Sequence, residues 1–336
     1  MYSKRFKGLL IPLLIVMVCA MAVAAPTGQR LRVLADQAGI LFGYASRNNF
    51  DTMSDSAAYQ EVARTEFNIL TCENAMKMDA LQPNQGQFNF APADVHVQFA
   101  QTNGMEVHGH TLVWHSQSPG WIQGISNRTQ LISAMNTHID TVLNHYSGQI
   151  LVWDVVNEAF NEDGSYRTSF WYNVIGPEYI DLAFQRARQA DPNTKLIYND
   201  YNLCELGSKS NGAYTMIQSM LSRGIPIDGV GFQMHLTAKG VNVHSFADNM
   251  ARFAALGLEI YITELDVRIP QNPSSSDLQN QANVYRTVIE TALAQPAVKV
   301  IQVWGIPDKY SWVPDVFPGT GAPLLFDDNY NAKPCY

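Results

Sequence analysis

Apolar residues along this chain gather into short runs that end in polar or aromatic side chains. Runs of this kind, rich in β-branched residues, are typical of parallel strands that are buried on both faces. Eight such runs predict strands at Leu41–Ala45, Phe67–Thr71, Glu106–His110, Leu151–Val156, Lys195–Tyr198, Gly229–Phe232, Ile260–Thr263 and Val300–Val303.

Helical periodicity fills the intervals between these runs. Ile180, Phe184 and Ala187 fall on one helical face, and similar patterns run toward stop signals at Gly224, Gly257 and Pro296. Strands that alternate with helices predict an α/β protein with the fold of a (β/α)₈ TIM barrel. Because no repeat, linker or composition break interrupts the pattern, we expect residues 26–336 to form a single domain.

Two of the predicted strands deliver a glutamate at their carboxyl ends. In 150–160 an apolar run leads to Asn157 and Glu158, and in 259–266 a similar run leads to Glu264. A carboxylate at the end of a buried strand is costly unless it is hydrogen-bonded or functional. Because the carboxyl ends of barrel strands form one face, we expect both glutamates in one cleft. Paired carboxylates are the minimum equipment for hydrolysing a glycosidic bond.

Aromatic and polar side chains accompany these glutamates at the predicted strand ends. Rings that can stack on a pyranose are Trp114, Tyr201, Trp304 and Trp312. Partners for sugar hydroxyls are Glu73, Asn74, Lys77, His110, Gln233 and His235, and Asn157 can reach a hydroxyl beside Glu158. Aromatic walls with a few converging polar groups are typical of a sugar cleft.

The amino terminus has the pattern of a secretory signal peptide. Basic residues before Gly8 precede an apolar run from Leu9 to Val23, and small residues then lead to Pro26. We therefore expect residues 1–25 to be removed and the mature protein to be extracellular, without a membrane anchor. The formal net charge of −8 argues against a polyanionic partner such as nucleic acid and is compatible with a neutral polymer.

Cysteine is sparse in the mature sequence. Loss of Cys19 with the signal leaves Cys72, Cys204 and Cys335, so at least one thiol is free or paired between chains. We expect the fold to depend on its core rather than on disulfides. Asn127 begins an acceptor triplet for glycosylation, whose occupancy the sequence leaves open.

Six sequence blocks, in a fixed order, carry a family resemblance. They are GHTLVWHSQ (109–117), WDVVNEAF (153–160), YNDYN (198–202), DGVGFQMH (228–235), ITELDVR (262–268) and WGIPDKYSW (304–312). This series resembles glycoside hydrolase family 10, the endo-β-1,4-xylanases, over essentially the whole mature chain.

The resemblance implies a (β/α)₈ retaining enzyme that acts on xylan and xylo-oligosaccharides without a cofactor or metal, and we expect a monomer. It makes Glu158 the acid/base and Glu264 the nucleophile. His235 resembles the family histidine that hydrogen-bonds the nucleophile, and Asp266 the aspartate that supports this histidine. Sugar-contacting positions of the family are matched by Glu73, Asn74, Lys77, His110, Trp114, Asn157, Gln233, Trp304 and Trp312.

The sequence departs from the family pattern at three places. Cys72 stands where a proline commonly precedes the Glu-Asn pair, and His108 stands where arginine often precedes Gly-His. Both changes are expected to act on the side of the cleft that holds the glycone. Ile306-Pro307 replaces the usual small polar pair after Trp-Gly, and Pro307 is expected to affect the loop that carries Trp312.

Other interpretations of these residues stay open at this level. A metal site at His108, His110 and His115 is one of them, although no cysteine or modified lysine accompanies these histidines. A β-1,4-glucanase, a broad aryl-glycosidase or a non-catalytic polysaccharide-binding barrel are alternative functions. His138 and His145 are interpreted as packing or surface residues, and Trp121 and Trp171 suit either the core or the cleft.

Overall fold

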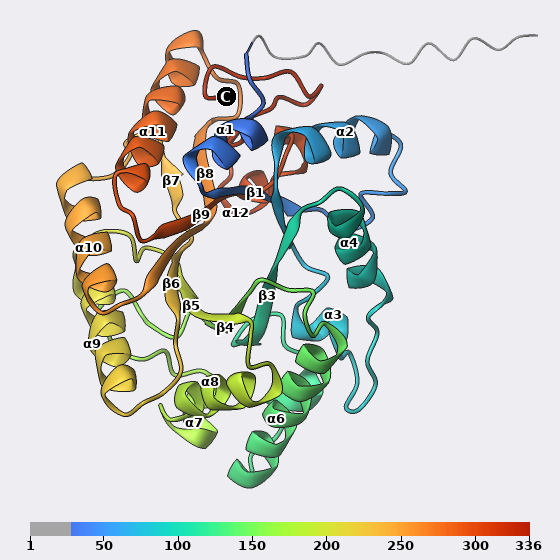
Figure 1. Cartoon of the computed structure of the whole chain (residues 1–336), viewed down its shortest axis with the longest axis vertical. Coiled ribbons are helices and arrows are strands. Elements are labelled where there is room, and N and C mark those ends of the chain that lie inside the picture. Colours follow the sequence, from blue (N-terminus) through green and yellow to red (C-terminus); the bar gives the residue numbers. More distant parts are fainter. Residues whose placement is uncertain (1–27) are drawn as a thin grey trace, which may run out of the picture.

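Figure 1 shows a closed barrel of parallel strands surrounded by helices, in a computed structural model that describes residues 28–336. The predicted signal peptide therefore lies outside the described residues. The barrel wall consists of β1 (Leu41–Ser46), β2 (Ile69–Cys72), β3 (Glu106–Trp114), β4 (Val152–Asn157), β5 (Lys195–Asp200), β6 (Gly229–Phe232), β8 (Glu259–Pro270) and β9 (Val298–Val303). They pair in the order β8-β6-β5-β4-β3-β2-β1-β9, and pairing of β8 with β9 closes the ring. The predicted (β/α)₈ fold is confirmed.

Helices cover the outside of this ring and fill its loops. The helices of eight or more residues are α1 (Leu31–Ala38), α2 (Ser56–Glu66), α4 (Ala91–Thr102), α6 (Arg128–His145), α8 (Tyr179–Ala190), α9 (Ser208–Ser222), α10 (Val243–Ala255) and α11 (Ser275–Leu293). Shorter ones are α3 (Met78–Leu81), α5 (Gly120–Gln123), α7 (Phe170–Ile175), η1 (Asp308–Tyr310) and α12 (Val313–Val316). The four helices expected from periodicity correspond to α8, α9, α10 and α11. Between residues 28 and 336, the structure contains no helix with both the length and the apolarity needed to cross a bilayer.

Two strands continue well past the ends that their apolar runs predict. β3 reaches Trp114 and β8 reaches Pro270, instead of ending at His110 and Thr263. The extension of β8 has partners of its own, because the short strands β7 (His235–Thr237) and β10 (Thr320–Gly321) both pair with it. Pairing with distant segments thus supplies backbone hydrogen bonds that a local hydrophobic pattern cannot indicate.

The barrel interior changes from apolar to polar along the strands. A small apolar cluster at the amino ends comprises Ile69, Val152, Ile197, Tyr261 and Val300. Side chains two positions further along a strand point to the same face. That spacing brings Thr71, Asp154, Asn199, Thr263 and Gln302 into the interior, where all are buried. A polar layer therefore lies directly below the carboxyl ends of the strands.

Glycine at position 109 allows β3 and β4 to lie next to each other. A Cβ atom at Gly109 would stand 2.3 Å from the fully buried ring of Trp153. Any larger residue would separate the two strands, which carry His110 and Glu158 toward the same face.

The structure shows whether the histidines and tryptophans that the sequence left unassigned lie in the core or at the surface. Trp171 is buried in the core, whereas Trp121 is half-buried and donates to the Gln82 carbonyl. His138 of α6 is fully buried and its Nδ1 lies 3.0 Å from Gln82 Oε1, whereas His145 is exposed and pairs with Asp94.

All three cysteines of the described chain are free. Cys72 and Cys204 are buried and Cys335 is half-buried, and burial raises the pKa of each thiol. Thiols of this kind are poor nucleophiles.

Asn127, the possible glycosylation site, caps α6 by accepting a hydrogen bond from the Gln130 amide at 3.0 Å.

Both ends of the described chain meet at one buried carboxylate. Glu66, at the end of α2, is fully buried, and it accepts hydrogen bonds from the Leu31 amide at 3.0 Å and the Tyr336 hydroxyl at 2.8 Å. The Arg30 guanidinium pairs with the same carboxylate. This contact fixes α1 and the carboxyl-terminal residue to the barrel.

Replacing Glu66 by alanine should destabilise the fold, because three donors would lose their acceptor and some would stay buried. We expect Glu66→Ala to lower the free energy of unfolding by about 2–3 kcal/mol. Guanidinium unfolding followed by tryptophan fluorescence measures this. The matched control is Glu61→Ala, which removes an exposed ion pair of the same helix and should change stability by less than about 0.5 kcal/mol. Equal effects of the two variants would contradict the role given to Glu66.

Candidate active site

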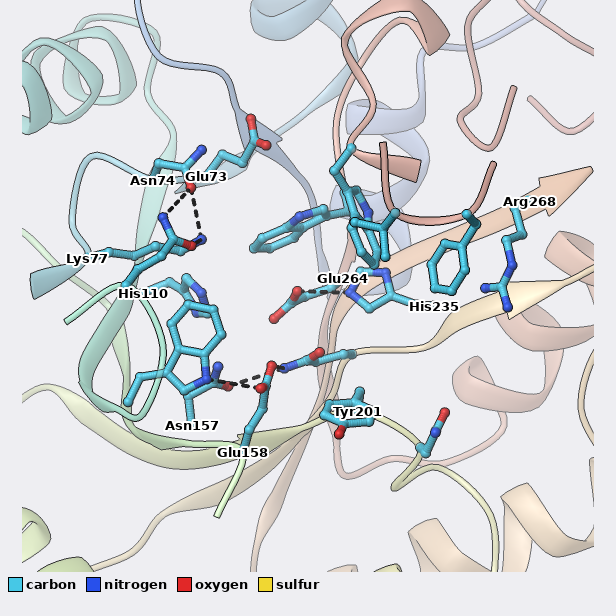
Figure 2. A pocket seen from close by; sticks show the side chains of 18 residues that line it. Glu73, Asn74, Lys77, His110, Asn157, Glu158, Tyr201, His235, Glu264 and Arg268 are labelled. Carbon is cyan, nitrogen blue, oxygen red and sulfur yellow. Dashed lines mark hydrogen bonds and ion pairs between the residues drawn. The ribbon is translucent and has the colours of Figure 1, made fainter. Parts of the chain in front are cut away.

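A cleft of about 600 Å³ lies at the carboxyl ends of the barrel strands. Figure 2 shows its side chains, with Glu158 and Glu264 facing each other near the centre. Its lining comprises Glu73, Asn74, Lys77, His110, Trp114, Gln117, Asn157, Glu158, Tyr201, Asn202, Gln233, His235, Glu264, Arg268, Trp304, Trp312, Val316 and Phe317. Every side chain predicted to contact sugar is in this set. Asp266 is the one predicted site residue outside it, because it lies fully buried behind His235.

Glu158 follows β4 and points into the cleft from an unusual backbone position. Its φ of 56° is in the left-handed region, which costs a residue with a Cβ atom about 1 kcal/mol or more. Its backbone amide donates to the Asn199 carbonyl at 2.9 Å, which holds this turn. The two carboxylate oxygens accept hydrogen bonds from Trp114 Nε1 at 3.0 Å and Gln233 Nε2 at 3.1 Å. Glu158 is therefore oriented by two neutral donors.

Glu264 lies deeper and is held by a different set of partners. Its Oε1 accepts a hydrogen bond from Asn199 Nδ2 at 2.8 Å, and its Oε2 lies 3.1 Å from His235 Nε2. The other ring nitrogen of His235 lies 2.9 Å from Asp266 Oδ2, which also accepts from Trp312 Nε1 at 2.9 Å. His235 thus stands between two carboxylates, and both of its ring nitrogens act as donors.

This arrangement keeps the central groups charged. Burial alone would lower the pKa of His235, but Asp266 and Glu264 raise it from 6.5 to about 10. Burial alone would raise the pKa of Glu264, but the hydrogen bond and the positive charge of His235 lower it below 4.5. At neutral pH Glu264 is therefore an anion beside an imidazolium, which is a state suited to a nucleophile.

A second buried network supports the floor of the cleft. Asp154 accepts from His108 Nε2 at 2.9 Å and from His110 Nδ1 at 2.7 Å, one oxygen for each ring. His108 Nδ1 bonds to Gln302 Oε1 at 2.8 Å. Burial disfavours the anion, but the two histidines lower the pKa of Asp154 to about 2. His108 and His110 share one face, as the strand alternation predicts.

A candidate metal site overlaps this network. Within the described residues, His110, Asp154 and Glu264 offer ligand atoms that lie within 4.8 Å of one another. However, both oxygens of Asp154 and both oxygens of Glu264 already accept hydrogen bonds. A metal ion here would have to displace them, and His115, the third histidine considered, is not among these ligands.

One end of the cleft carries a cluster around Lys77. This lysine is buried, and its Nζ donates to Asn74 Oδ1 at 2.9 Å and Gln117 Oε1 at 2.6 Å. Burial lowers the pKa of Lys77 and raises that of Glu73, although each charge favours the other. These groups offer donors and acceptors to sugar hydroxyls at this end.

Tyr201 has its ring fixed on the far side of Glu158. Lys209 Nζ lies 3.3 Å from the centre of the ring, and Arg167 donates to the tyrosine hydroxyl at 2.9 Å. Lys209 pairs in turn with the buried Asp200 at 2.9 Å. Burial raises the pKa of Asp200 to about 7 against the effect of Lys209. Tyr201 is thus a rigid platform rather than a mobile ring.

The departures from the family pattern do not alter the cleft lining directly. Cys72 and His108 are fully buried, and neither lines the cleft. Any effect of these two residues on the glycone side would therefore act through their neighbours, Glu73 after Cys72 and His110 through the shared Asp154, and this expectation stays a prediction. Pro307 is also buried and forms a bridge to Phe326, while Trp312 still reaches the cleft.

Sequence reasoning missed several residues of the site. Asn199 joins three groups, because its Nδ2 lies 2.8 Å from Glu264 Oε1, 3.1 Å from Asn157 Oδ1 and 3.3 Å from Asp154 Oδ2. Its position directly after a predicted strand indicated that it could lie near the cleft. Its partners could not be predicted, because they come from other strands. Further lining residues that were not predicted are Gln117, Asn202, Arg268, Val316 and Phe317.

Comparison with known proteins shows what the chain is similar to. Residues 30–336 match the model of glycosyl hydrolase family 10. Endo-1,4-beta-xylanase B of Thermotoga neapolitana is 52% identical over 308 residues, which cover 91% of this chain and 89% of that protein. Native xylanase 10B of Thermotoga maritima is 53% identical, with a TM-score of 0.90 over 91% of this chain and 95% of that one. Xylanase 10B of Thermotoga petrophila RKU-1, solved in complex with xylobiose, is 52% identical, with a TM-score of 0.91 over 93% and 96% of the two chains.

The raised pKa of His235 predicts how stability depends on pH. A group whose pKa is higher in the folded than in the unfolded state contributes its full stabilisation of the fold at pH values below the unfolded pKa. This contribution is lost as pH rises toward the pKa of the folded state. The stability advantage of the unmodified protein over His235→Gln should therefore shrink by about 2–4 kcal/mol between about pH 6 and about pH 10. Denaturant unfolding at a series of pH values measures it. His145→Gln, which removes an exposed histidine, is the control, and a pH-independent advantage over His235→Gln would contradict the imidazolium.

Proposed function

Since the chain belongs to glycosyl hydrolase family 10, we propose that it is an endo-1,4-β-xylanase that hydrolyses internal bonds of xylan with retention of anomeric configuration. The observation that carries the proposal is the pair Glu158 and Glu264, which face one cleft in unlike environments (Figure 2). One carboxylate is buried beside a cation and the other is held by neutral donors. Two carboxyl groups with separate roles are what a retaining glycosidase requires.

In the proposed first step, Glu264 attacks the anomeric carbon. The His235 and Asn199 hydrogen bonds hold the carboxylate in one orientation and leave it ionised. The bond from the anomeric carbon to the leaving oxygen breaks as the carbon–Glu264 bond forms. A nucleophile held in place in this way loses little entropy when the transition state is reached.

Glu158 is proposed to protonate the leaving oxygen in that step. In the second step it would take a proton from water, which attacks the anomeric carbon and releases Glu264. Trp114 and Gln233 keep the carboxyl group in place for both transfers. Asn157, the preceding residue, would bind the 2-hydroxyl of the sugar at the reaction centre.

The remaining lining residues are proposed to bind the xylan chain on either side. Trp304 and Trp312 would stack on a sugar ring near Glu264, and Tyr201 would do so beyond Glu158. Glu73, Asn74, Lys77 and His110 would bind hydroxyls at the other end of the cleft.

Secretion is proposed from the pattern in residues 1–25, and amino-terminal sequencing of protein recovered from culture medium tests it.

Azide rescue separates the roles of the two glutamates. Glu158→Ala should hydrolyse xylan very poorly, because xylan needs its leaving oxygen protonated. It should still form a glycosyl-enzyme from a dinitrophenyl xylobioside, whose leaving group needs no proton. Azide should then attack this intermediate and give a β-azide, whose configuration is determined by NMR.

Glu264→Ala has no nucleophile and should be inactive on both substrates. Azide can only replace the missing carboxylate, so the rescued product should be an α-azide. Glu290→Ala removes an exposed glutamate of α11 and should retain full activity as the control. An α-azide from Glu158→Ala would reverse the assignment, and net inversion by the unmodified enzyme would contradict the mechanism.

Sugar choice gives a second test of the proposed function. If Glu73, Lys77 and Trp304 crowd the place that a hexose hydroxymethyl group would occupy, cellulose chains should fit poorly. The clash should cost a few kcal/mol, so kcat/KM for xylo-oligosaccharides should exceed that for cello-oligosaccharides of equal length by about 100-fold or more. Similar values for the two series would point to a broader β-1,4-glycanase.

A further inference from the structure

Arg268 lines the cleft at the end opposite Lys77 (Figure 2). It lies on β8, four residues after Glu264, in the extension of this strand beyond its apolar run. The side chain is half-buried and lies on the same side of the cleft as His235. Among the residues that line the cleft, Lys77 and Arg268 are the only lysine and arginine.

The two cations differ in how the protein uses them. Lys77 donates to Asn74 and Gln117, so its charge is already solvated by the protein. The Arg268 guanidinium has no hydrogen bond or ion pair with any side chain or backbone group in residues 28–336. Several arginines in the same range pair with acids, as Arg188 does with Asp228 and Arg223 with Asp181, but none of these lines the cleft. All N–H groups of the Arg268 guanidinium are therefore available to bind a ligand.

The guanidinium is nevertheless held in a defined place. Its central carbon lies 3.9 Å from the centre of the Phe317 ring, a cation–π contact that leaves the edge of the guanidinium group open. Phe317 packs edge-on against Trp312, with 5.6 Å between ring centres, and Trp312 donates to Asp266. A donor fixed in this way loses little freedom when it binds a ligand.

The segment that carries Phe317 is attached to the same strand as Arg268. Strand β10 pairs with β8 through Thr320 and Pro270, and the Gln271 amide donates to the Gly319 carbonyl at 3.2 Å. The strand and the loop thus form one unit, in which Phe317 supports Arg268 directly.

An open guanidinium in this cleft is suited to a carboxylate. Arginine binds carboxylates through two parallel hydrogen bonds, which an ammonium group cannot match. The chain has a formal net charge of −8, and Glu73, Glu158 and Glu264 line the same cleft. An acidic branch on the substrate would be repelled by these groups unless a local cation received it. Arg268 is the cation available for that purpose.

We propose that Arg268, supported by Phe317, binds the carboxylate of a uronic-acid branch on the xylan chain and thereby selects acidic xylan. The proposal rests on the xylanase activity proposed above and names the substrate class within it. It assigns Arg268 to substrate specificity and gives it no part in bond cleavage.

The test compares two substrates that differ only at the carboxyl group of the branch. One is a xylo-oligosaccharide with a single glucuronosyl branch, and the other is the same compound with its carboxyl group reduced to the alcohol. The readout is the ratio of kcat/KM for the acidic substrate to kcat/KM for the reduced one, measured separately for each enzyme. We expect Arg268→Gln to lower this ratio about fivefold. Arg268→Lys should lower it by less, because it keeps the charge but loses the planar fork.

The matched control is Arg286→Gln, which removes an exposed arginine of α11 and should leave the ratio unchanged. Salt dependence gives an independent measurement. Raising the ionic strength from about 0.02 M to about 0.5 M should lower the ratio of the unmodified enzyme, whereas the ratio of Arg268→Gln should not fall.

Two results would overturn the proposal. One is an equal ratio in the unmodified enzyme and in Arg268→Gln, which would mean that Arg268 only packs against Phe317 and does not bind the branch. The other is a ratio of the unmodified enzyme that does not respond to salt. Absence of any hydrolysis of the unbranched xylo-oligosaccharide by the unmodified enzyme is a separate result, which would instead refute the xylanase proposal.

Discussion

The ion pair between Glu264 and His235 is the interaction on which the rest of this site depends. A carboxylate buried at the end of a barrel strand stays ionised only if a donor compensates the lost hydration. His235 supplies that compensation, and it stays charged because Asp266 faces its other nitrogen. Asp266 also receives the indole N–H of Trp312. The charge of the proposed nucleophile and the position of an aromatic wall are therefore linked through one aspartate.

The polar layer of the barrel holds the central side chains of the cleft in fixed positions. Asp154, Asn199 and Gln302 point into the barrel one step above its apolar floor. Their hydrogen bonds reach upward to His110 and Glu264. Groups held by strands are more precisely placed than groups held by loops. Here strands carry Asp154, Asn199 and Glu264, whereas Glu158 directly follows the end of β4.

The sequence allowed both the barrel and its two glutamates to be predicted, because each strand is a local apolar run with a polar end. It could not indicate which distant side chains meet. Asn199 was visible as a polar residue after a strand, but its contacts with Glu264 and Asn157 arise from pairing between strands. Arg268 lies beyond the predicted end of its strand, where β7 and β10 extend β8 through long-range pairing. Phe317 comes from a loop with no periodic pattern, so nothing local connects it to Arg268.

The contact of Glu66 with both Arg30 and Tyr336 also has a consequence for how the barrel can be rearranged. Helix α1 ends just before β1, and Glu66 ends the helix just before β2, so this contact lies at the amino ends of the strands. The cleft occupies the opposite face. A circularly permuted chain, in which a short linker joins Tyr336 to Arg30, would thus keep every strand in its place and leave the cleft unobstructed. The closed ring of strands has no inherent first member, and new chain ends can be placed in an exposed loop on the face away from the substrate.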